Sequence, residues 1–247
     1  MPLMLNDPMI PLALTGIALL LLFLSGWLAW PWMMASLQQS RIRHILSGFE
    51  HEGAVALHDV MLADRKGETV WIDHLLVSKR GLLAVQVLAF NGQILGSLRD
   101  ALWTIENNLG RHRFPNPLRQ TAQAEEVIAN ILGSKFTVQT AIIPAGGSIT
   151  GSMPAQVIPA GRLRDFILAE SEKNLSESRI RWLSNTISQV LIDDPAQKQK
   201  HMEEVMARLG DRAKLRRAKI IMLASCVLML AVIAIVGLHY AAWAGEV

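Results

Sequence analysis

Basic residues between positions 66 and 119 gather in segments that the sequence pattern marks as turns or as a hairpin. Such clusters suit contacts with the phosphate groups of nucleic acid. Turn residues are also commonly charged because they are solvated, and only Phe114 is interleaved with the run Arg111–Arg113, so the sequence offers no platform for base stacking. The residues are Lys66, Lys79, Arg80, Arg99, Arg111, His112, Arg113 and Arg119. A phosphate-binding surface is therefore one prediction, and a solvated charged face is its competitor.

Two other features indicate little chemistry. Residues 145–154 are rich in glycine, but they lack the lysine that a phosphate-binding P-loop needs, so we expect a surface loop. Cys226 is the single cysteine, which excludes an internal disulfide, and it lies in an apolar stretch. Neither an oxidising compartment nor a cysteine metal site is implied.

The composition divides the chain into two apolar ends and a charged middle. Of 247 residues, 51% are hydrophobic and 18% are charged, a balance that argues against a purely soluble protein and against a disordered tail. All 24 lysine and arginine residues lie between Arg41 and Lys219. The middle is long enough for one α/β domain that buries its own core.

Both ends are predicted to cross a membrane. No charged residue occurs from Pro8 to Ser40, and residues 10–30 meet the roughly 20-residue length of a helix that spans a bilayer core. Residues 220–238 are also uncharged and apolar. A cleaved signal peptide would have a basic start and a shorter apolar run, so Asp7 and the long run favour a spanning helix.

Positive charge beside the two apolar segments predicts their orientation. Arg41 and Arg43 follow the first segment, and a basic run from Arg212 to Lys219 precedes the second. Because such residues stay on the cytoplasmic side, we expect the central domain in the cytoplasm and both short termini on the far side. The basic run would also attract anionic lipid headgroups, although its effect on topology is a sufficient explanation.

The first half of the middle segment predicts strands. Residues 54–62 and 69–78 pair naturally as a hairpin around a polar break. The nearly continuous apolar run 82–90 fits a central strand covered on both faces. Asn91-Gly92 is a strong hairpin signal. We expect a short strand at 93–97 after it, and then residues 101–114 folding back on themselves through residues 107–110.

The second half predicts mainly helices. Asn116 followed by Pro117 is typical of a helix start, with asparagine as the cap and proline in the first helical position. Asp194 and Pro195 mark another start in the same way. The predicted helices are 117–132, 161–170, 176–191 and 195–219, with further strands at 136–143 and 156–158.

The fold class is therefore α/β, with a mixed sheet flanked by helices and inserted between two transmembrane helices. The predicted parts are an N-terminal transmembrane helix in residues 1–35, an α/β domain in 36–175, a helical region in 176–219, and a C-terminal transmembrane helix with a short tail in 220–247.

Short motifs between residues 67 and 120 follow one another in a characteristic order. They are Gly67, Ile72-Asp73-His74, Val77-Ser78, Gly81, Gly92, Ile94, Gly96, Trp103 and Asn116-Pro117-x-x-Gln120. In this order and spacing they resemble the nuclease-related domain, NERD, a bacterial relative of the PD-(D/E)xK endonuclease fold. The resemblance implies a restriction-endonuclease-like mixed sheet, and membrane helices beside such a domain are common in the family. It therefore suits a multi-pass protein of a bacterial inner membrane.

The resemblance also implies what chemistry to expect. These enzymes hydrolyse phosphodiesters with a divalent cation held by carboxylates, and Asp73 matches the first of these carboxylates. The family's Glu-x-Lys falls on Gln86 and Leu88, which supply neither the second negative charge nor the ammonium. No acid occurs in residues 37–46, where the family tends to carry a glutamate, and Ala124 stands where an aromatic residue or histidine is common. Asp73 alone would bind a metal ion only weakly.

The leading hypothesis is a non-catalytic NERD-like domain, anchored in the membrane, that binds nucleic acid or a protein partner at the cytoplasmic membrane face. No cofactor is expected. A polar pair at Asp73 and His74 needs no catalytic role, and Asn116 is explained equally well as a helix cap. The candidate contacts with nucleic acid are Lys79, Arg80, Arg111, Arg113, Asn116 and Gln120.

Two alternatives remain. One is a DNA nuclease with a relocated site, in which Asp73 and one or more of Glu50, Glu52 and Asp59 hold Mg²⁺. The other is a membrane scaffold with a helical arm. The apolar stripe of that arm, which we expect to pack on the domain or on a partner helix, consists of Ile180, Leu183, Ile187, Val190 and Leu191.

Overall fold

The computed structural model divides the chain into two compact units. One consists of Met1–Met33 and Asp211–Val247, and the other of Met34–Gly210. The structure describes residues 9–63, 67, 69–107, 110–133, 136–149, 153–169, 175–200, 220, 223–231, 233–234 and 237. Lys66 and the predicted basic run from Arg212 to Lys219 lie outside the described residues.

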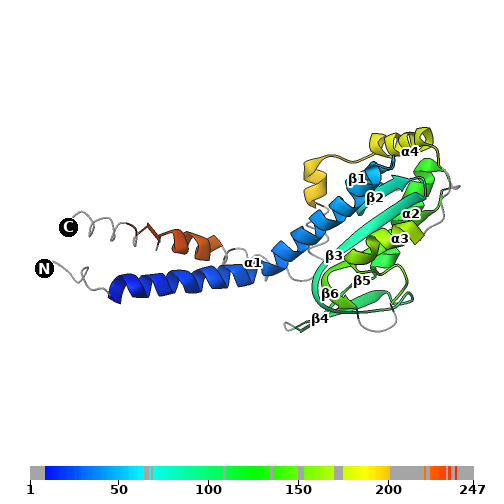
Figure 1. Ribbon diagram of the computed structural model, residues 1–247. Coiled ribbons are helices and arrows are strands. Elements are labelled where there is room, and N and C mark those ends of the chain that lie inside the picture. Colours follow the sequence, from blue (N-terminus) through cyan, green and yellow to red (C-terminus); the bar gives the residue numbers. More distant parts are fainter. Residues whose placement is uncertain are drawn as a thin grey trace. The chain divides into compact units, whose positions relative to one another are not determined.

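Strands dominate the first half of the larger unit and helices follow (Figure 1). In chain order the elements are α1 (Met9–Glu50), β1 (Val55–Ala63), β2 (Thr69–Ser78), β3 (Gly81–Leu95), β4 (Leu102–Asn107), β5 (Gly110–Pro115), α2 (Pro117–Leu132), β6 (Val138–Ile149), the 3-10 helix η1 (Ala160–Arg162), α3 (Leu163–Ala169) and α4 (Glu177–Gln189). Residues 195–200 and 223–231 are also helical.

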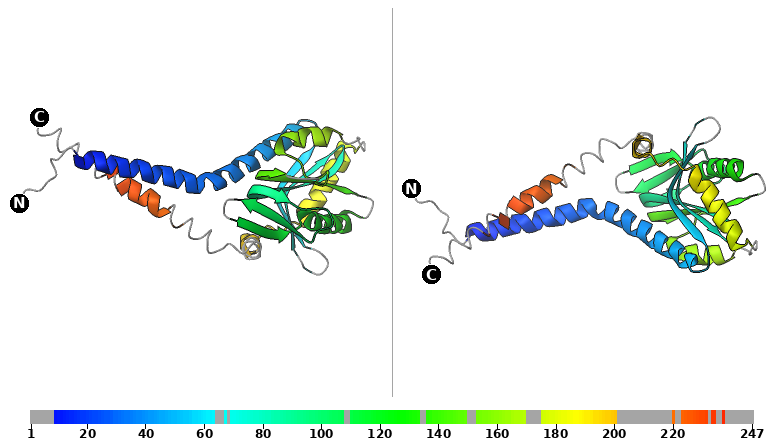
Figure 2. Two further views of the ribbon diagram at one scale, coloured as in Figure 1. Left: turned by 90° about the horizontal axis from the view of Figure 1, so that it is seen from below. Right: turned by 90° about the horizontal axis from the view of Figure 1, so that it is seen from above.

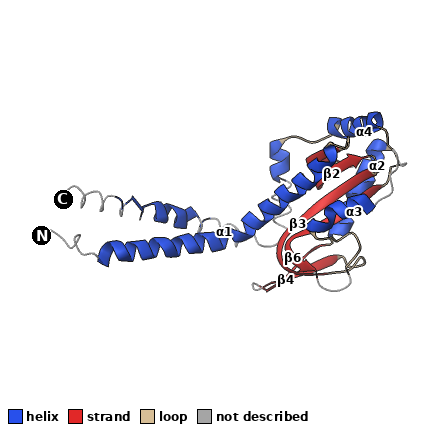
Figure 3. Cartoon of the chain, viewed as in Figure 1, coloured by secondary structure: helices blue, strands red, loops and turns tan. Residues whose placement is uncertain are grey.

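The sheet is built around β3. The strand order is β1-β2-β3-β4-β5, with antiparallel pairing throughout, and β6 pairs in parallel with β3. The first half of β3 contacts β2 and its second half contacts β4, while β6 runs along the other side of both halves. Figure 3 shows β3 as the long bent strand of this sheet. The predicted mixed α/β sheet is confirmed, and so is the hairpin of β1 and β2.

The predicted hairpin turn at Asn91-Gly92 is wrong. The strand β3 continues through both residues to Leu95, because Asn91 and Gly92 pair with Gly146 and Gly147 of β6. A shift of register between Leu88 and Asn91 produces the bend, and Gly92 adopts a φ of 135° that favours glycine. The separate strand expected at 93–97 is therefore the end of β3.

The glycine-rich stretch also differs from its prediction. Instead of a surface loop from residue 145 onward, β6 extends to Ile149, because its glycines lie beside the bent part of β3. The predicted strand at 156–158 is reduced to one bridge between Ile142 and Val157. Pairing with a distant strand decides both outcomes, and local composition does not reveal such pairing.

Helices cover both faces of the sheet (Figure 2). On one face α2 and α4 pack on β1, β2 and the start of β3, and Ile180, Leu183 and Ile187 of the predicted stripe are buried there. On the other face α1 contributes Ile42 and Leu46, and α3 contributes its own apolar residues. A third apolar cluster lies between the second half of β3, β4 and β5; its buried members are Leu88, Ile94, Trp103, Ile105, Phe114, Ile142 and Val157.

A clamp holds the loop between β3 and β4. The indole N–H of Trp103 donates to the carbonyl of Ser97 at 2.9 Å, and a Cβ added to Gly96 would lie 2.3 Å from the Trp103 ring. The amide of Asn116 donates to the carbonyl of Asp100 at 2.7 Å, while its oxygen accepts from the backbone N–H of Leu118 at 2.9 Å. Asn116 is thus the predicted N-cap of α2 and also a support for the loop.

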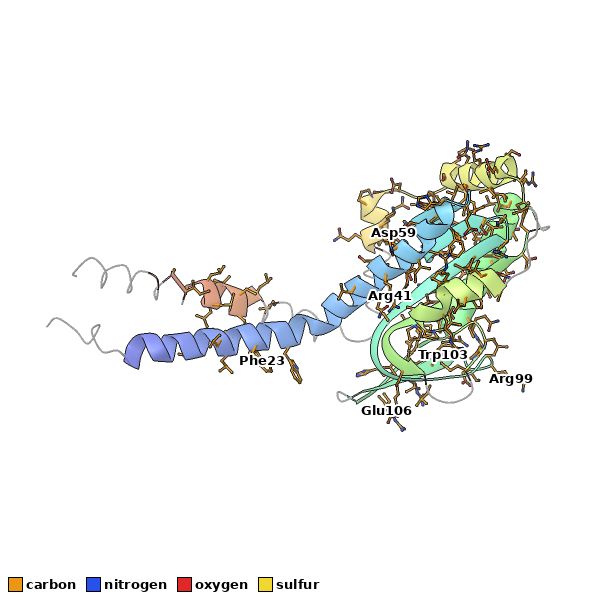
Figure 4. The ribbon with its side chains drawn as sticks, in the orientation of Figure 1. Phe23, Arg41, Asp59, Arg99, Trp103 and Glu106 are labelled. Atoms are coloured by element: carbon orange, nitrogen blue, oxygen red, sulfur yellow. The ribbon has the colours of Figure 1, made fainter. Side chains whose placement is uncertain are left out.

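The smaller unit contains the first part of α1 and the last described helical residues of the chain. Large apolar side chains on both are exposed; they include Leu19, Leu20, Phe23 and Trp27 on α1, and Leu223, Val227, Leu228 and Leu230 near the C-terminus. Phe23 is marked in Figure 4. Among the described residues, no helix combines the length and the apolarity needed to cross a membrane.

Candidate functional site

The strands β1 and β2 share an irregularity at the position of Asp73. In a regular strand, residues two apart share a face, so residues three apart lie on opposite faces. Ile72 and Leu75 of β2 are three apart, yet both face the apolar cluster beneath α2. Along β1 the same change occurs between Leu57 and Val60, and Asp59 between them has a φ of 53°. The left-handed region is tolerated by aspartate better than by most residues. The hairpin thus brings Asp59 and Asp73 to the same irregular point.

Asp73 is buried at the point where β2 and β3 stop pairing. The last backbone pair is His74 with Val85, and beyond it the carboxylate of Asp73 accepts a hydrogen bond from the backbone N–H of Val87 at 2.6 Å. Its second oxygen accepts from the indole N–H of Trp71 at 3.1 Å. Burial raises the pKa of Asp73 to about 6, against the lowering effect of these two hydrogen bonds.

A histidine pair lies next to Asp73. The Nδ1 atoms of His58 and His74 are 2.9 Å apart, so one ring donates and the other accepts. His74 is fully buried, its Nε2 has no partner among the described residues, and burial lowers its pKa to about 4. The guanidinium of Arg43 bonds to Asp59 at 2.8 Å, which ties α1 to β1 beside this pair.

Sequence reasoning missed His58 and Arg43. The register of the predicted hairpin would have revealed His58, because a hairpin that pairs Val55 with Val77 also pairs His58 with His74. Nothing in the sequence placed Arg43 of α1 over Asp59, since that contact depends on the packing of a helix against the sheet. Gln38 of α1, whose side-chain oxygen is buried without a partner among the described residues, was missed for the same reason.

The Glu-x-Lys positions, Gln86 and Leu88, differ in their surroundings. Gln86 is half-buried on β3 and follows Ala84 on the face of the strand that α2 covers. Leu88 is 7% exposed and belongs to the apolar cluster that contains Trp103. An ammonium at position 88 would therefore lie in an apolar core. Asp73 is close to this segment, because it bonds to the residue between Gln86 and Leu88.

The carboxylates that could serve a relocated metal site have other partners. Asp59 bonds to Arg43, and Glu52 lies 3.7 Å from the ammonium of Lys79. Glu50, at the end of α1, is exposed. Within the part of the chain that the structure describes, no group of three histidine, cysteine, aspartate or glutamate side chains is placed to hold a metal ion.

The predicted contacts with nucleic acid fall into two groups at opposite ends of β3. Lys79 and Arg80 occupy the turn between β2 and β3, where Ser78 pairs with Gly81. Arg111 and Arg113 lie on β5, which is joined through β4 to the last residues of β3. The structure therefore does not bring the four basic residues together.

The second group also contains Arg99 and Arg119, which the sequence pattern places among the basic residues of the predicted surface. On β5, Arg111 forms an ion pair with Glu106 at 2.8 Å, while Arg113 is exposed opposite Thr104. Arg119 and Gln120 are exposed in the first turn of α2, and Arg119 donates to the carbonyl of Arg99 at 3.4 Å. Figure 4 shows Arg99 and Glu106 along one border of the domain. We call this set the hairpin surface; it comprises Leu98, Arg99, Leu102, Arg111, Arg113, Arg119 and Gln120.

Asn116 supports the hairpin surface from within. Its side chain is fully buried, and its amide bonds to the carbonyls of Ser97 and Asp100. Since these bonds and the cap of α2 occupy the side chain, Asn116 has no exposed surface to offer a ligand. Its part in any interface is to position the loop that carries Arg99.

Comparison with known proteins identifies the region that contains this site. Residues 36–144 match the family of nuclease-related domains, NERD, which confirms the predicted relationship over that segment. The chain is also 22% identical over 167 residues to an uncharacterized protein of Bacillus anthracis, a match that covers 66% of this chain and 79% of the relative. No solved structure matches the chain.

The surroundings of Leu88 predict how a lysine would behave there. Leu88→Lys buries an ammonium in an apolar cluster and should destabilise the domain by about 3–5 kcal/mol, whereas Leu88→Met should cost less than about 1.5 kcal/mol. Proteolysis of the full-length variants in increasing urea measures the difference. Equal resistance of the two variants would show that position 88 is open to solvent.

Asp73 and His74 predict an unusual pH dependence of stability. The raised pKa of Asp73 makes the folded state bind a proton more readily than the unfolded state, so this contribution weakens as pH rises from about 4 to about 6. The lowered pKa of His74 has the opposite sign, and its contribution weakens as pH falls from about 6.5 to about 4. The two effects oppose each other in the wild type between about pH 4 and pH 6.

Asp73→Asn should expose the histidine effect. The free energy of unfolding of this variant should fall on acidification from about pH 6 to about pH 4, more steeply than that of the wild type by up to about 1.4 kcal/mol per pH unit. Urea unfolding at several pH values measures the slope. Parallel curves for variant and wild type would contradict the assignment.

Proposed function

Because residues 36–144 match the nuclease-related domain, we propose that this protein is a membrane-anchored member of that class that binds nucleic acid and does not cleave it. The single observation that carries the proposal is the hairpin surface, where Arg99, Arg113 and Arg119 form no ion pair with any carboxylate that the structure describes. A protein partner in place of nucleic acid is the competing form of the same proposal.

The absence of cleavage is argued from the Glu-x-Lys positions. A metal-dependent nuclease needs carboxylates that attract the ion and a cation that stabilises the developing charge on phosphate. Gln86 is neutral, Leu88 is packed among apolar side chains, and both oxygens of Asp73 accept hydrogen bonds from the protein. Burial also favours the protonated form of Asp73, which binds a metal ion less well.

Exposed positive charge on a fixed surface supports the binding of nucleic acid. Arg99, Arg113 and Arg119 are exposed. Hydrogen bonds from Trp103 and Asn116 hold the loop between β3 and β4, which carries Arg99. Phosphate binding needs such cations and releases condensed counterions. The turn with Lys79 and Arg80 offers less, since Lys79 lies beside Glu52.

Membrane anchoring is argued from the sequence of the two ends and from the exposed side chains on them. Residues 10–30 and 220–238 carry no charge, and Leu19, Leu20, Phe23 and Trp27 are exposed on α1. Large apolar side chains at such density are costly in water and stable in a bilayer. The basic residues that flank both segments favour a cytoplasmic location of the domain, as in a bacterial inner membrane.

Removal of exposed arginines should weaken binding of DNA. In fluorescence anisotropy with full-length protein in detergent, Arg113→Gln and Arg119→Gln should each raise Kd about threefold to tenfold and lower the slope of log Kd against log salt by about 0.7–0.9. Arg162→Gln and Arg181→Gln, which change exposed arginines outside the hairpin surface, serve as matched controls. Equal effects of all four variants would mean that binding is diffuse, and no binding at low salt would refute the nucleic-acid proposal.

Cleavage assays test the alternative of a relocated nuclease site. With Mg²⁺ or Mn²⁺, the wild-type protein should leave plasmid and single-stranded DNA intact under conditions where it binds them. Cleavage that disappears in Asp73→Ala would establish the nuclease in place of the non-catalytic domain.

Membrane anchoring is tested on the whole protein. After expression in bacteria, the protein should stay in the membrane fraction through carbonate washing, and protease added from the cytoplasmic side should cleave the central domain. Release by carbonate would contradict integral anchoring. It would leave the binding proposal open to its own test.

A further inference from the structure

Two exposed leucines lie among the arginines of the hairpin surface. Leu98 is 61% exposed and Leu102 is 49% exposed. Contact of these large apolar side chains with water does not stabilise the fold. Neither the family match nor the binding proposal explains them. Their surroundings indicate which kind of nucleic acid the surface fits.

Leu102 lies on the same face of the hairpin as Arg113. In the register of β4 and β5, Leu102 is opposite Pro115 and Thr104 is opposite Arg113, so the two side chains are diagonal neighbours on the exposed face. Trp103, between Leu102 and Thr104, points to the opposite, buried face. The strand alternation thus fixes the direction of Leu102.

Leu98 lies in the clamped loop beside Arg99. The carbonyl of Ser97 accepts from both Trp103 and Asn116, and the carbonyl of Arg99 accepts from Arg119. These bonds hold the loop before any ligand arrives, so little conformational entropy is lost on binding. Leu98 and Arg99 therefore project from one preformed loop, and Leu102 and Arg113 project from the exposed face of the adjoining hairpin.

A duplex does not suit these exposed side chains. The outside of a duplex presents phosphates, while its bases are stacked and paired, so Leu98 and Leu102 would face hydrated phosphate groups. A lipid surface suits them less well too, because two leucines offer little apolar area to bury in a bilayer. A single strand offers unpaired bases together with phosphates.

We propose that the hairpin surface binds single-stranded nucleic acid, with phosphates on Arg99, Arg113 and Arg119 and with bases against Leu98 and Leu102. This inference rests on the proposed binding function. It adds the class of ligand and assigns the discrimination between single strand and duplex to the two leucines.

The experiment compares single strand and duplex on full-length protein. Anisotropy is measured with a labelled oligonucleotide of about 20 nucleotides, alone and annealed to its complement. The wild type should bind the single strand at least about tenfold more tightly than the duplex. Leu98→Ser with Leu102→Ser should weaken binding of the single strand about fivefold to tenfold and leave binding of the duplex unchanged. Arg113→Gln should weaken both.

Leu168→Ser is the matched control, because Leu168 is a 40% exposed leucine on α3, outside the hairpin surface. Since all three leucines are exposed, the variants should unfold at the same temperature as the wild type, which circular dichroism checks. Equal affinity for the two ligands, or a leucine variant that affects both or neither, would overturn this inference while leaving the binding function intact. Binding of neither ligand by the wild type would instead refute the proposed function.

Discussion

The middle of the sheet depends on a buried carboxylate, that of Asp73, which forms no ion pair with a cation among the described residues. Asp73 lies where β2 separates from β3, and its oxygens accept hydrogen bonds from the Val87 amide and the Trp71 indole. Burial disfavours the ionised carboxylate, as its raised pKa indicates. The two hydrogen bonds offset part of that cost. The same carboxylate thus acts as a structural acceptor that closes the end of the β2–β3 ladder.

The apolar residue at position 88 has a structural consequence of its own. Leu88 joins β3 to Trp103 of β4 and Phe114 of β5 in one buried cluster. A lysine in its place would need a charged partner, and Gln86 cannot provide one. With leucine, the cluster instead stabilises the attachment of the β4–β5 hairpin, which carries Arg111 and Arg113. Leu88 at the centre of the sheet therefore supports the surface at the border of the sheet.

The sequence predicted what depends on local pattern. Alternation and turn residues were enough for β1, β2 and their hairpin, and the Asn116 cap was enough for the start of α2. It failed at Asn91-Gly92, where pairing with β6 from more than 50 residues away extends β3 through a turn signal. The candidate site divided in the same way. Asp73, Gln86 and Leu88 follow from motif order, and His58 follows from the register of the hairpin, but the contact of Arg43 follows only from packing.

Asn116 shows why a family match and a site are different statements. The motif residues Gly96, Trp103 and Asn116 all act inside the domain, where they fix the loop after β3 against the start of α2. None of them touches solvent enough to choose a ligand. The side chains that would choose it, those of Leu98 and Arg99, stand on the outside of the same loop and belong to no motif. A family match that rests on such internal residues therefore indicates how the surface is supported. The ligand has to be inferred from the side chains that are exposed on that surface.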